Sequence, residues 1–158
     1  MKRRNFVALL AGFLASRGAS AATQSSGGEI RKLVLSTEEW KKRLTPQQFA
    51  VLREEATERA WTSPLNEEKR KGTFACAGCD LPLFDSSTKF DSGTGWPSFY
   101  DCLKGHVETK TDFKLIYPRT EYHCARCGGH QGHVFDDGPP PTGKRYCNNG
   151  VALRFIPA

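Results

Sequence analysis

The fold of this chain is decided by two short stretches of one pattern, Phe74-Ala75-Cys76-Ala77-Gly78-Cys79 and Tyr122-His123-Cys124-Ala125-Arg126-Cys127. Each stretch places an aromatic residue two positions before a C-x-x-C pair. Thiolates at this spacing can point at one ion from a tight turn, and four of them complete a closed tetrahedral zinc site. We therefore expect one structural Zn²⁺, which would join two hairpins distant in sequence and contribute folding free energy directly. Its ligands would be Cys76, Cys79, Cys124 and Cys127.

Two other interpretations of these four cysteines stay open at this point. They could form two disulfides, or one pair could act as a redox-active dithiol. A general thiol–disulfide oxidoreductase of the second kind would hold no tightly bound metal. The paired pattern favours zinc, because a single C-x-x-C would be a much weaker signal than two that share their flanking aromatic residue.

The segments around the cysteines predict a mainly β domain preceded by short helices. Capping boxes that begin at Ser36 and Thr45 predict helices over 37–43 and 46–56. After Gly72, short apolar pieces alternate with turns rich in Gly and Pro, as is typical of strands. The expected strands are 73–76, 114–117, 122–124, 133–135 and 151–156. We expect two small antiparallel sheets, a β-tent-like arrangement, with the zinc site between distant hairpins.

The positive charge of the chain is concentrated at its N-terminus. The formal net charge is +6 over 158 residues, and four basic residues lie in the first two dozen positions, where there is no Asp or Glu. Without them the net charge is about +2, which is close to neutral for arguments about partners. We therefore expect no nucleic-acid partner.

The same N-terminal segment predicts a secretory signal peptide over residues 1–21. A basic start at Lys2–Arg4 precedes an apolar run over Phe6–Ala15, and Ala19-Ser20-Ala21 fits a cleavage site. The apolar run is too short to span a bilayer, so we expect no membrane association after the signal is removed. Residues 22–30 are expected to form a flexible linker.

The destination predicted by this signal is the periplasm. Arg3-Arg4 followed by Asn5-Phe6 resembles a twin-arginine export signal, which would let the zinc site fold before it meets an oxidising compartment. A mitochondrial or other organellar presequence is the alternative. The mature domain would span residues 31–158.

The two remaining cysteines, Cys102 and Cys147, do not belong to a C-x-x-C pair of the kind that binds zinc. Cys147 lies in Arg145-Tyr146-Cys147-Asn148-Asn149, where the nearby Arg would favour the reactive thiolate. The alternative is a small buried core residue. Cys102 has no motif of its own, and is either a free thiol or a partner for Cys147.

Three long stretches together resemble the B-type methionine sulfoxide reductases, and the resemblance runs from about Glu38 to Phe155. They are Lys89-Phe-Asp-Ser-Gly-Thr-Gly-Trp-Pro-Ser-Phe99, Gly129-His-Gln-Gly-His-Val-Phe-Asp-Asp-Gly138 and Arg145-Tyr-Cys-Asn-Asn-Gly-Val-Ala-Leu-Arg-Phe155, with Glu58-Arg59 and Phe84-Asp-Ser-Ser-Thr-Lys-Phe90 upstream. The resemblance implies an oxidoreductase that converts methionine-R-sulfoxide, in proteins and also as the free amino acid, to methionine.

The resemblance also implies a role for each residue of the site. Cys147 would be the nucleophile, and Trp96 and Phe155 would form the apolar slot for the methyl group. The polar set would be His130 and His133 on the sulfoxide oxygen, Asp137 to orient them, Arg145 on the thiolate and Asn149 on the polar wall. For Trp96 the alternative is ordinary core packing. For the histidines it is a further metal-ligand pair.

The implied chemistry leaves a sulfenic acid on Cys147, which another thiol must reduce. Many family members have a resolving cysteine two residues before the Trp, where this chain has Thr94. We expect Cys102, or an external thioredoxin-like reductant, to take that role.

Asn148 stands where the family usually has Val or Ile. The protein is expected to be a monomer that acts on oxidised proteins. The rival hypothesis is a zinc-dependent interaction module without catalysis.

Overall fold

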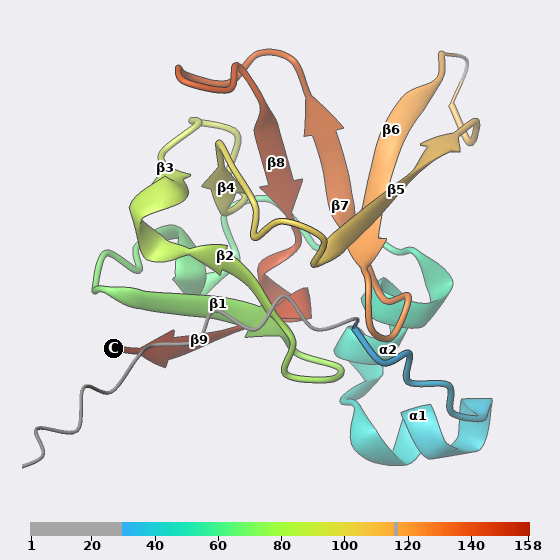
Figure 1. Ribbon diagram of the computed structural model, residues 1–158. Coiled ribbons are helices and arrows are strands. Elements are labelled where there is room, and N and C mark those ends of the chain that lie inside the picture. Colours follow the sequence, from blue (N-terminus) through green and yellow to red (C-terminus); the bar gives the residue numbers. More distant parts are fainter. Residues whose placement is uncertain (1–29, 116) are drawn as a thin grey trace, which may run out of the picture.

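The computed structural model describes residues 30–115 and 117–158, so the expected signal peptide and most of the linker lie outside the described residues. The strands are β1 (Gly72–Cys76), β2 (Pro82–Asp85), β3 (Lys89–Phe90), β4 (Ser98–Phe99), β5 (Val107–Asp112), β6 (Arg119–Cys124), β7 (His130–Phe135), β8 (Arg145–Asn148) and β9 (Leu153–Pro157). They form a three-stranded sheet in the order β2-β1-β9 and a six-stranded sheet in the order β3-β4-β8-β7-β6-β5 (Figure 1). All pairings are antiparallel, so the predicted mainly β fold with two antiparallel sheets is confirmed.

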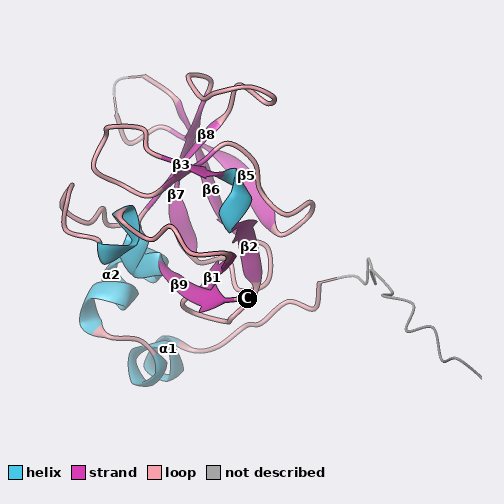
Figure 2. Cartoon of the chain, turned by 90° about the vertical axis from the view of Figure 1, so that its left-hand side faces the viewer, coloured by secondary structure: helices cyan, strands magenta, loops and turns pink. Residues whose placement is uncertain are grey.

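Both predicted helices are present and begin where their capping boxes place them. Helix α1 spans Thr37–Arg43 and α2 spans Pro46–Glu54, and each has the reciprocal hydrogen bonds of a capping box. Helix α2 ends before residue 56 because Glu55 adopts a left-handed conformation with φ of 56°. The two helices lie together at one end of the molecule (Figure 2).

The strand predictions were right for four segments out of five. The exception is the segment 114–117, where residues 114, 115 and 117 lie in the loop between β5 and β6. The strand that precedes this loop, Val107–Asp112, is largely polar and exposed, so its sequence carries no alternation of apolar residues. The last strand begins later than predicted, at Leu153, because Gly150–Ala152 form a 3₁₀ turn.

The core lies between the two sheets and is built from aromatic rings. Phe84 stacks on Phe99 with ring centroids 4.1 Å apart, and Phe74 packs edge-on against Phe99 at 5.0 Å. Tyr122 and Tyr146 extend this cluster along the six-stranded sheet with centroids 5.3 Å apart. Since side chains alternate between faces along a strand, the neighbours of these residues point to the second face of that sheet. Within the described residues, none of the helices combines the length and the apolar character that a membrane crossing requires.

Candidate metal centre and active site

Four cysteine sulfurs meet at the end of the molecule that the helices cover. Their sulfur atoms all lie within 4.8 Å of one another, and all four residues are buried. The Sγ atoms of Cys76 and Cys127 are 3.7 Å apart, and those of Cys79 and Cys124 are 3.5 Å apart. A disulfide would require about 2.05 Å, so none of these pairs is bonded. The two predicted C-x-x-C pairs therefore form one cluster.

The size of the cluster fits a tetrahedral thiolate site. A zinc–sulfur bond of about 2.3 Å places the four sulfurs of a regular tetrahedron about 3.8 Å apart. The observed separations of 3.5 and 3.7 Å are close to this value. Four sulfur donors leave no position for water or substrate, so a metal ion held here would be structural.

The two halves of the cluster have the same local shape as well as the same sequence pattern. Each chain turn closes on a residue with positive φ directly after its second cysteine, Asp80 at 60° and Gly128 at 66°. The backbone N–H of Asp80 donates to the carbonyl of Cys76 at 2.9 Å, and that of Gly128 donates to Cys124 at 2.8 Å. Glycine suits this backbone conformation, and Asp tolerates it better than most residues.

The N-terminal helices hold both turns in place. Arg43 of α1 donates from Nε to the carbonyl of Gly78 at 2.7 Å, and Arg53 of α2 donates to the carbonyl of Cys127 at 2.8 Å. Leu52 packs so closely on Gly129 that a β-carbon there would lie 2.9 Å from its Cδ2 atom. The helices thus form the outer wall of the cysteine cluster.

A second cluster of reactive side chains lies on the six-stranded sheet, on the face opposite the aromatic core. Cys147 of β8 is directly paired with His133 of β7 and with Ser98 of β4, and His133 is paired with Glu121 of β6. Directly opposite residues of antiparallel strands point to the same face. Strand register therefore brings these four side chains into one row from segments far apart in the sequence.

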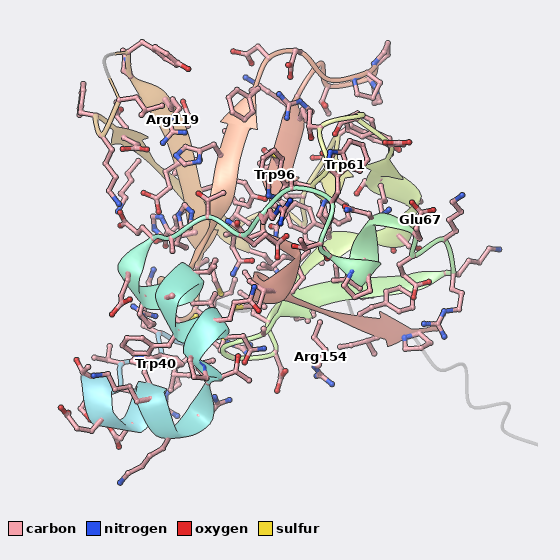
Figure 3. All side chains as sticks on the ribbon, turned by 180° about the vertical axis from the view of Figure 1, so that it is seen from behind. Trp40, Trp61, Glu67, Trp96, Arg119 and Arg154 are labelled. Atoms are coloured by element: carbon pink, nitrogen blue, oxygen red, sulfur yellow. The ribbon has the colours of Figure 1, made fainter. Side chains whose placement is uncertain are left out.

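Cys147 faces a small cavity of about 140 Å³, which we call the slot. Its lining residues come from strands β6, β7 and β8 and from the loops after α2, before β4 and after β8: Thr57, Trp96, Arg119, Gly132, His133, Phe135, Cys147, Asn148 and Asn149. Figure 3 shows Trp96 at the centre of this side of the molecule, with Arg119 to one side of it. Gly132 is required here, because a β-carbon would lie 1.9 Å from the carbonyl oxygen of Cys147. The slot thus unites the predicted Cys147, His133, Trp96 and Asn149.

Glu58 joins the two walls of the slot. Its carbonyl accepts a hydrogen bond from Nε1 of Trp96 at 3.1 Å, and its backbone N–H donates to Oδ1 of Asn149 at 2.9 Å. Its buried carboxylate accepts from the backbone N–H groups of Gly150 at 2.5 Å and Val151 at 2.9 Å. Sequence reasoning quoted Glu58 only as part of the resemblance and missed this role.

His133 is held by a carboxylate that sequence reasoning also missed. Its Nε2 lies 2.8 Å from Oδ2 of Asp112, and Arg119 donates to the same oxygen at 2.7 Å. A carboxylate only accepts, so the ring Nε2–H donates. The backbone N–H of Lys114 and the His133 ring hold the pKa of Asp112 well below its usual range. Asp112 therefore stays ionised and acts as the hydrogen-bond acceptor for the His133 ring.

His130 lies behind His133 and does not line the slot. Its Nδ1 lies 2.7 Å from Oε1 of Glu121, and Lys110 pairs with the other carboxylate oxygen at 3.0 Å. The two imidazole rings pack edge to face with centroids 5.6 Å apart. Burial lowers the pKa of His130, which favours its neutral form, although Glu121 opposes that shift. The structure thus separates two histidines that the resemblance gave one role.

The environment of Cys147 shifts the pKa of its thiol in two opposite directions. Burial raises the pKa of Cys147, while the charge of Arg145 and hydrogen bonding from Thr94 and Arg145 lower it, with a net result above the ordinary value. Arg145 thus acts in the predicted direction, but the desolvation of the sulfur outweighs it. Thr94, at the position of the usual resolving cysteine, lies within hydrogen-bonding range of the Cys147 sulfur.

Asp137 contacts Arg145 and not the histidines. Its carboxylate accepts two parallel hydrogen bonds from the guanidinium, each of 2.8 Å, and the side chain is 62% exposed. The guanidinium also lies 4.4 Å from the ring centroid of Phe135. The carboxylates that hydrogen-bond His130 and His133 are therefore those of Glu121 and Asp112, while the carboxylate of Asp137 binds Arg145.

Two other predicted residues lie away from the slot. Phe155 is paired with Phe74 in the three-stranded sheet, and their rings pack 5.0 Å apart, so the apolar wall at the slot is Phe135 instead. Cys102 packs against the core and contacts Tyr146, which points to the opposite face of the sheet from its neighbour Cys147. The described conformation does not bring the sulfurs of Cys102 and Cys147 together.

Comparison with known proteins agrees with this geometry. The family model described as the SelR domain matches residues 44–157. "Peptide methionine sulfoxide reductase B1, chloroplastic" of Arabidopsis thaliana is 58% identical over 77% of this chain and 60% of its own length. "Peptide methionine sulfoxide reductase MsrB" is 55% identical in Methanosarcina barkeri, over 76% of this chain and 85% of that protein. In Pseudomonas putida it is 53% identical, over 81% and 97% respectively.

The chain thus spans less than two thirds of the plant relatives and most of the archaeal and bacterial ones. Among solved structures, the "Yippee-like" domain of Mis18 covers 56% of this chain and 98% of its own, at 18% identity and a TM-score of 0.44, a partial resemblance only. The resemblance drawn from the three long motifs is confirmed by the matched region and by these identities. The chain belongs to the SelR-domain family, the family of the B-type methionine sulfoxide reductases.

Proposed function

We propose that this protein reduces methionine-R-sulfoxide to methionine, with oxidised proteins as its substrates. The observation that carries the proposal is the slot, in which a thiol, a carboxylate-bound imidazole and an indole face one small cavity. A sulfoxide needs these three groups: a sulfur nucleophile, a proton donor for its oxygen, and an apolar surface for its methyl group. The names of the curated relatives support the same activity.

In the proposed reaction, the sulfur of Cys147 attacks the sulfoxide sulfur while the sulfoxide oxygen accepts a proton from His133. The new sulfur–sulfur bond expels the protonated oxygen as hydroxide, so the sulfur–oxygen bond of the substrate breaks. The hydroxide then attacks the Cys147 sulfur and breaks the sulfur–sulfur bond, so that methionine leaves with the electron pair and Cys147 carries a sulfenic acid. The substrate sulfur gains two electrons and the Cys147 sulfur loses two, so the products are methionine and an oxidised enzyme. Asp112 stabilises the imidazolium that donates the proton.

The remaining residues orient the substrate and the nucleophile. Trp96 is fixed by its hydrogen bond to Glu58 and offers its ring to the methyl group, and Asn149 is fixed by Glu58 and by its Nδ2 hydrogen bond to the carbonyl of Gln131 at 2.9 Å. Arg145 favours the ionised form of Cys147. Because these side chains are already bonded to the protein, they lose little freedom when substrate binds.

We assign the cysteine cluster a structural Zn²⁺ that stabilises the fold and takes no part in the reaction. Its four buried sulfurs match the donor set and spacing of a tetrahedral thiolate site. The ion would tie the ends of β1 and β6 to the helices. All steps of the reaction are therefore assigned to the residues of the slot.

The sulfenic acid on Cys147 is proposed to react with an external thiol. Cys102 lies on the core side of the sheet and would need a rearrangement to reach it, whereas Thr94 is already next to the sulfur. On this basis Cys102→Ser should retain turnover with a small dithiol. Thr94→Cys should form an internal disulfide with Cys147 after one turnover, detectable as the loss of two free thiols. A Cys102→Ser variant that stalls after one turnover would instead assign resolution to Cys102.

We further propose that residues 1–21 direct the protein out of the cytoplasm and that the mature domain, residues 31–158, acts as a monomer in the periplasm. The basic, apolar and small-residue segments of the N-terminus support export. Cell fractionation and N-terminal sequencing of the mature protein test it. Retention of residues 1–21 in a cytoplasmic fraction would contradict it.

The activity is tested by measuring turnover of the separate R and S epimers of a methionine sulfoxide peptide, with a small dithiol as reductant. Turnover of the R epimer alone, abolished in Cys147→Ser, would establish the activity and the nucleophile. A folded, metal-loaded sample that turns over neither epimer would contradict the proposal and favour the non-catalytic interaction module.

A further inference from the structure

A second cavity of about 280 Å³ adjoins the slot on the far side of Trp96. Trp96 lines both cavities, so the second cavity lies within reach of residues that neighbour a side chain placed in the slot. Figure 3 shows Trp61 and Glu67 on this side of Trp96, and Arg119 on the other. The reaction assigned above uses none of the other residues that line this second cavity.

Trp61 forms an exposed aromatic wall of the second cavity. It is 67% exposed, and its φ of 67° is a rare backbone conformation for a bulky residue. Its backbone N–H donates to the carbonyl of Gly95 at 2.8 Å, and its ring lies so close to Gly95 that a β-carbon there would be 2.8 Å from Nε1. Asn66 donates to the same carbonyl at 3.1 Å. The fold therefore holds an indole in solvent, in a strained conformation, next to the slot.

The other walls of the cavity are polar and carry both signs of charge. The lining includes three carboxylates and two ammonium groups, those of Glu67, Glu68, Asp91, Lys69 and Lys89. The Nζ atom of Lys89 is anchored by the carbonyl of Asn66 at 2.8 Å. Opposite charges in one small cavity do not favour a strongly acidic or strongly basic ligand. An indole with hydrogen-bonding groups around it instead suits peptide amides and uncharged side chains.

We propose that this cavity binds the residues that flank the oxidised methionine in a polypeptide, with Trp61 as the platform on which a flanking residue packs. The inference rests on the proposed function and makes it narrower, because it assigns a binding site to the polypeptide around the sulfoxide. A free amino acid has no flanking residues, so it uses the slot alone. The protein is thereby adapted to oxidised proteins.

The first test compares two substrates with one set of variants. The substrates are free methionine-R-sulfoxide and a short uncharged peptide with the R-sulfoxide at its centre, and the variants are Trp61→Ala, Trp61→Phe and Phe113→Ala. Trp61→Ala should lower kcat/KM for the peptide about tenfold, mainly through a higher KM. Its kcat/KM for the free amino acid should stay at the wild-type value, which also shows that the slot is intact.

The matched variants separate the cavity from general effects of aromatic removal. Trp61→Phe keeps an aromatic platform and should retain most of the activity on the peptide. Phe113 is also aromatic and exposed but lies in the β5–β6 loop, so Phe113→Ala should behave as wild type. Equal losses on both substrates, or a peptide-specific loss in Phe113→Ala and not in Trp61→Ala, would overturn the proposal.

A second test does not depend on turnover. In a Cys147→Ser background, affinity for the same peptide is measured by titration calorimetry with and without Trp61→Ala. A weaker affinity of the Trp61→Ala double variant supports the cavity even if the reductase activity is absent. Unchanged affinity overturns the cavity and leaves the proposed function standing.

Discussion

The cysteine cluster and the slot are built in opposite ways. The cluster consists of two short turns, and within each turn the spacing of the ligands is set over four consecutive residues. The slot takes its side chains one by one from β6, β7, β8 and the loops that contain Thr57 and Trp96, so its geometry depends on strand register. Local spacing can be read from a sequence, whereas register across a sheet is a property of the whole fold.

The two sites should also differ in what their loss does. The cluster lies between the helices and the ends of two strands, so its ligands stabilise the fold. The slot lies on one face of an already formed sheet, so its reactive side chains should affect the rate far more than the stability. Substitutions at the two sites test this contrast directly.

Loss of a cluster ligand should have the largest effect. Cys124→Ser removes one of four sulfurs and is expected to abolish stable metal binding, at a cost on the order of 10 kcal/mol in metal-linked folding free energy. The variant should be largely unfolded, with a near-zero metal-to-protein ratio by atomic emission. Chelation of the wild type should reproduce the effect. A folded, metal-free Cys124→Ser variant would refute the structural role.

Loss of the nucleophile should remove activity and leave the fold intact. Cys147→Ser is expected to lower the turnover of methionine-R-sulfoxide by at least about 10³-fold, with the metal content and the thermal melt of the wild type. Cys102→Ser is the matched control, since Cys102 is also a partly buried cysteine outside the cluster. If the control also failed to release one methionine per enzyme in a single turnover without reductant, the slot would not be the reactive site.

Much of the fold was predictable because the deciding signals were local. The cysteine spacing, the two capping boxes and the alternation near the C-terminus each lie within a few residues, and the structure follows them. The strand over Val107–Asp112 was not predicted because its side chains are polar and exposed, and its pairing with β6 is what defines it.

The candidate site was predictable in its members but not in their contacts. The motifs pointed to Cys147, His133 and Trp96. Asp112 lies in no motif, and Glu58 was part of the resemblance without an assigned role, so their contacts follow only from the fold. The short turn that joins β6 to β7 was the available signal, because it pairs Glu121 with His133. Phe155 lies on β9 of the other sheet and does not line the slot in the structure.

Asp112 and Asp137 offer a direct test of structure against motif. The resemblance assigned the orienting role to Asp137. In the structure the carboxylate that hydrogen-bonds His133 is that of Asp112, whereas Asp137 binds Arg145. Asp112→Asn should lower kcat by tens of fold, about 2 kcal/mol, with little change in KM, because the imidazolium loses its counter-charge. Asp137→Asn should have a smaller effect, through Arg145. The reverse order would restore the interpretation drawn from the motif.

The same aspartate predicts a pH dependence of stability. The folded-state pKa of Asp112 lies below its unfolded value, so its stabilisation is complete above about pH 4 and is lost as the pH falls through the folded-state pKa. Asp112→Asn should therefore melt at a lower temperature than wild type at pH 7, and the difference should shrink at acidic pH. A difference that grew on acidification would contradict this assignment.

The reactivity of Cys147 should depend on pH in the direction set by burial. Since burial raises the pKa of its thiol, alkylation of Cys147 in a Cys102→Ser background should reach half its maximal rate at a pH above that of a free cysteine, about 8.5. Arg145→Met removes a charge that favours the thiolate, so it should move the midpoint further up. A midpoint below 8.5 in the parent protein would mean that Arg145 outweighs burial.

The smallest expected effect lies next to Cys147, on the core face. The phenol of Tyr122 donates to Oδ1 of Asn148 at 2.6 Å, and both side chains are fully buried. Tyr122→Phe leaves that oxygen without its partner, which should lower the free energy of unfolding by about 1–2 kcal/mol in urea titrations. Asn148→Val alone should lower the free energy of unfolding by a similar amount, because it leaves the buried Tyr122 hydroxyl without its hydrogen-bond acceptor.

The double variant Tyr122→Phe/Asn148→Val removes both partners and should recover most of the loss. The carbonyl of Asn149, which accepts from Asn148 at 2.7 Å, keeps its hydrogen bond from the N–H of Ala152 at 3.0 Å. Turnover should stay near the wild-type value in Tyr122→Phe, since Tyr122 packs on the core face and does not line the slot. If the losses in free energy of unfolding of the two single variants simply add in the double variant, the two side chains are not energetically coupled. The hydrogen bond to Tyr122 would then not explain why Asn148 is tolerated beside Cys147.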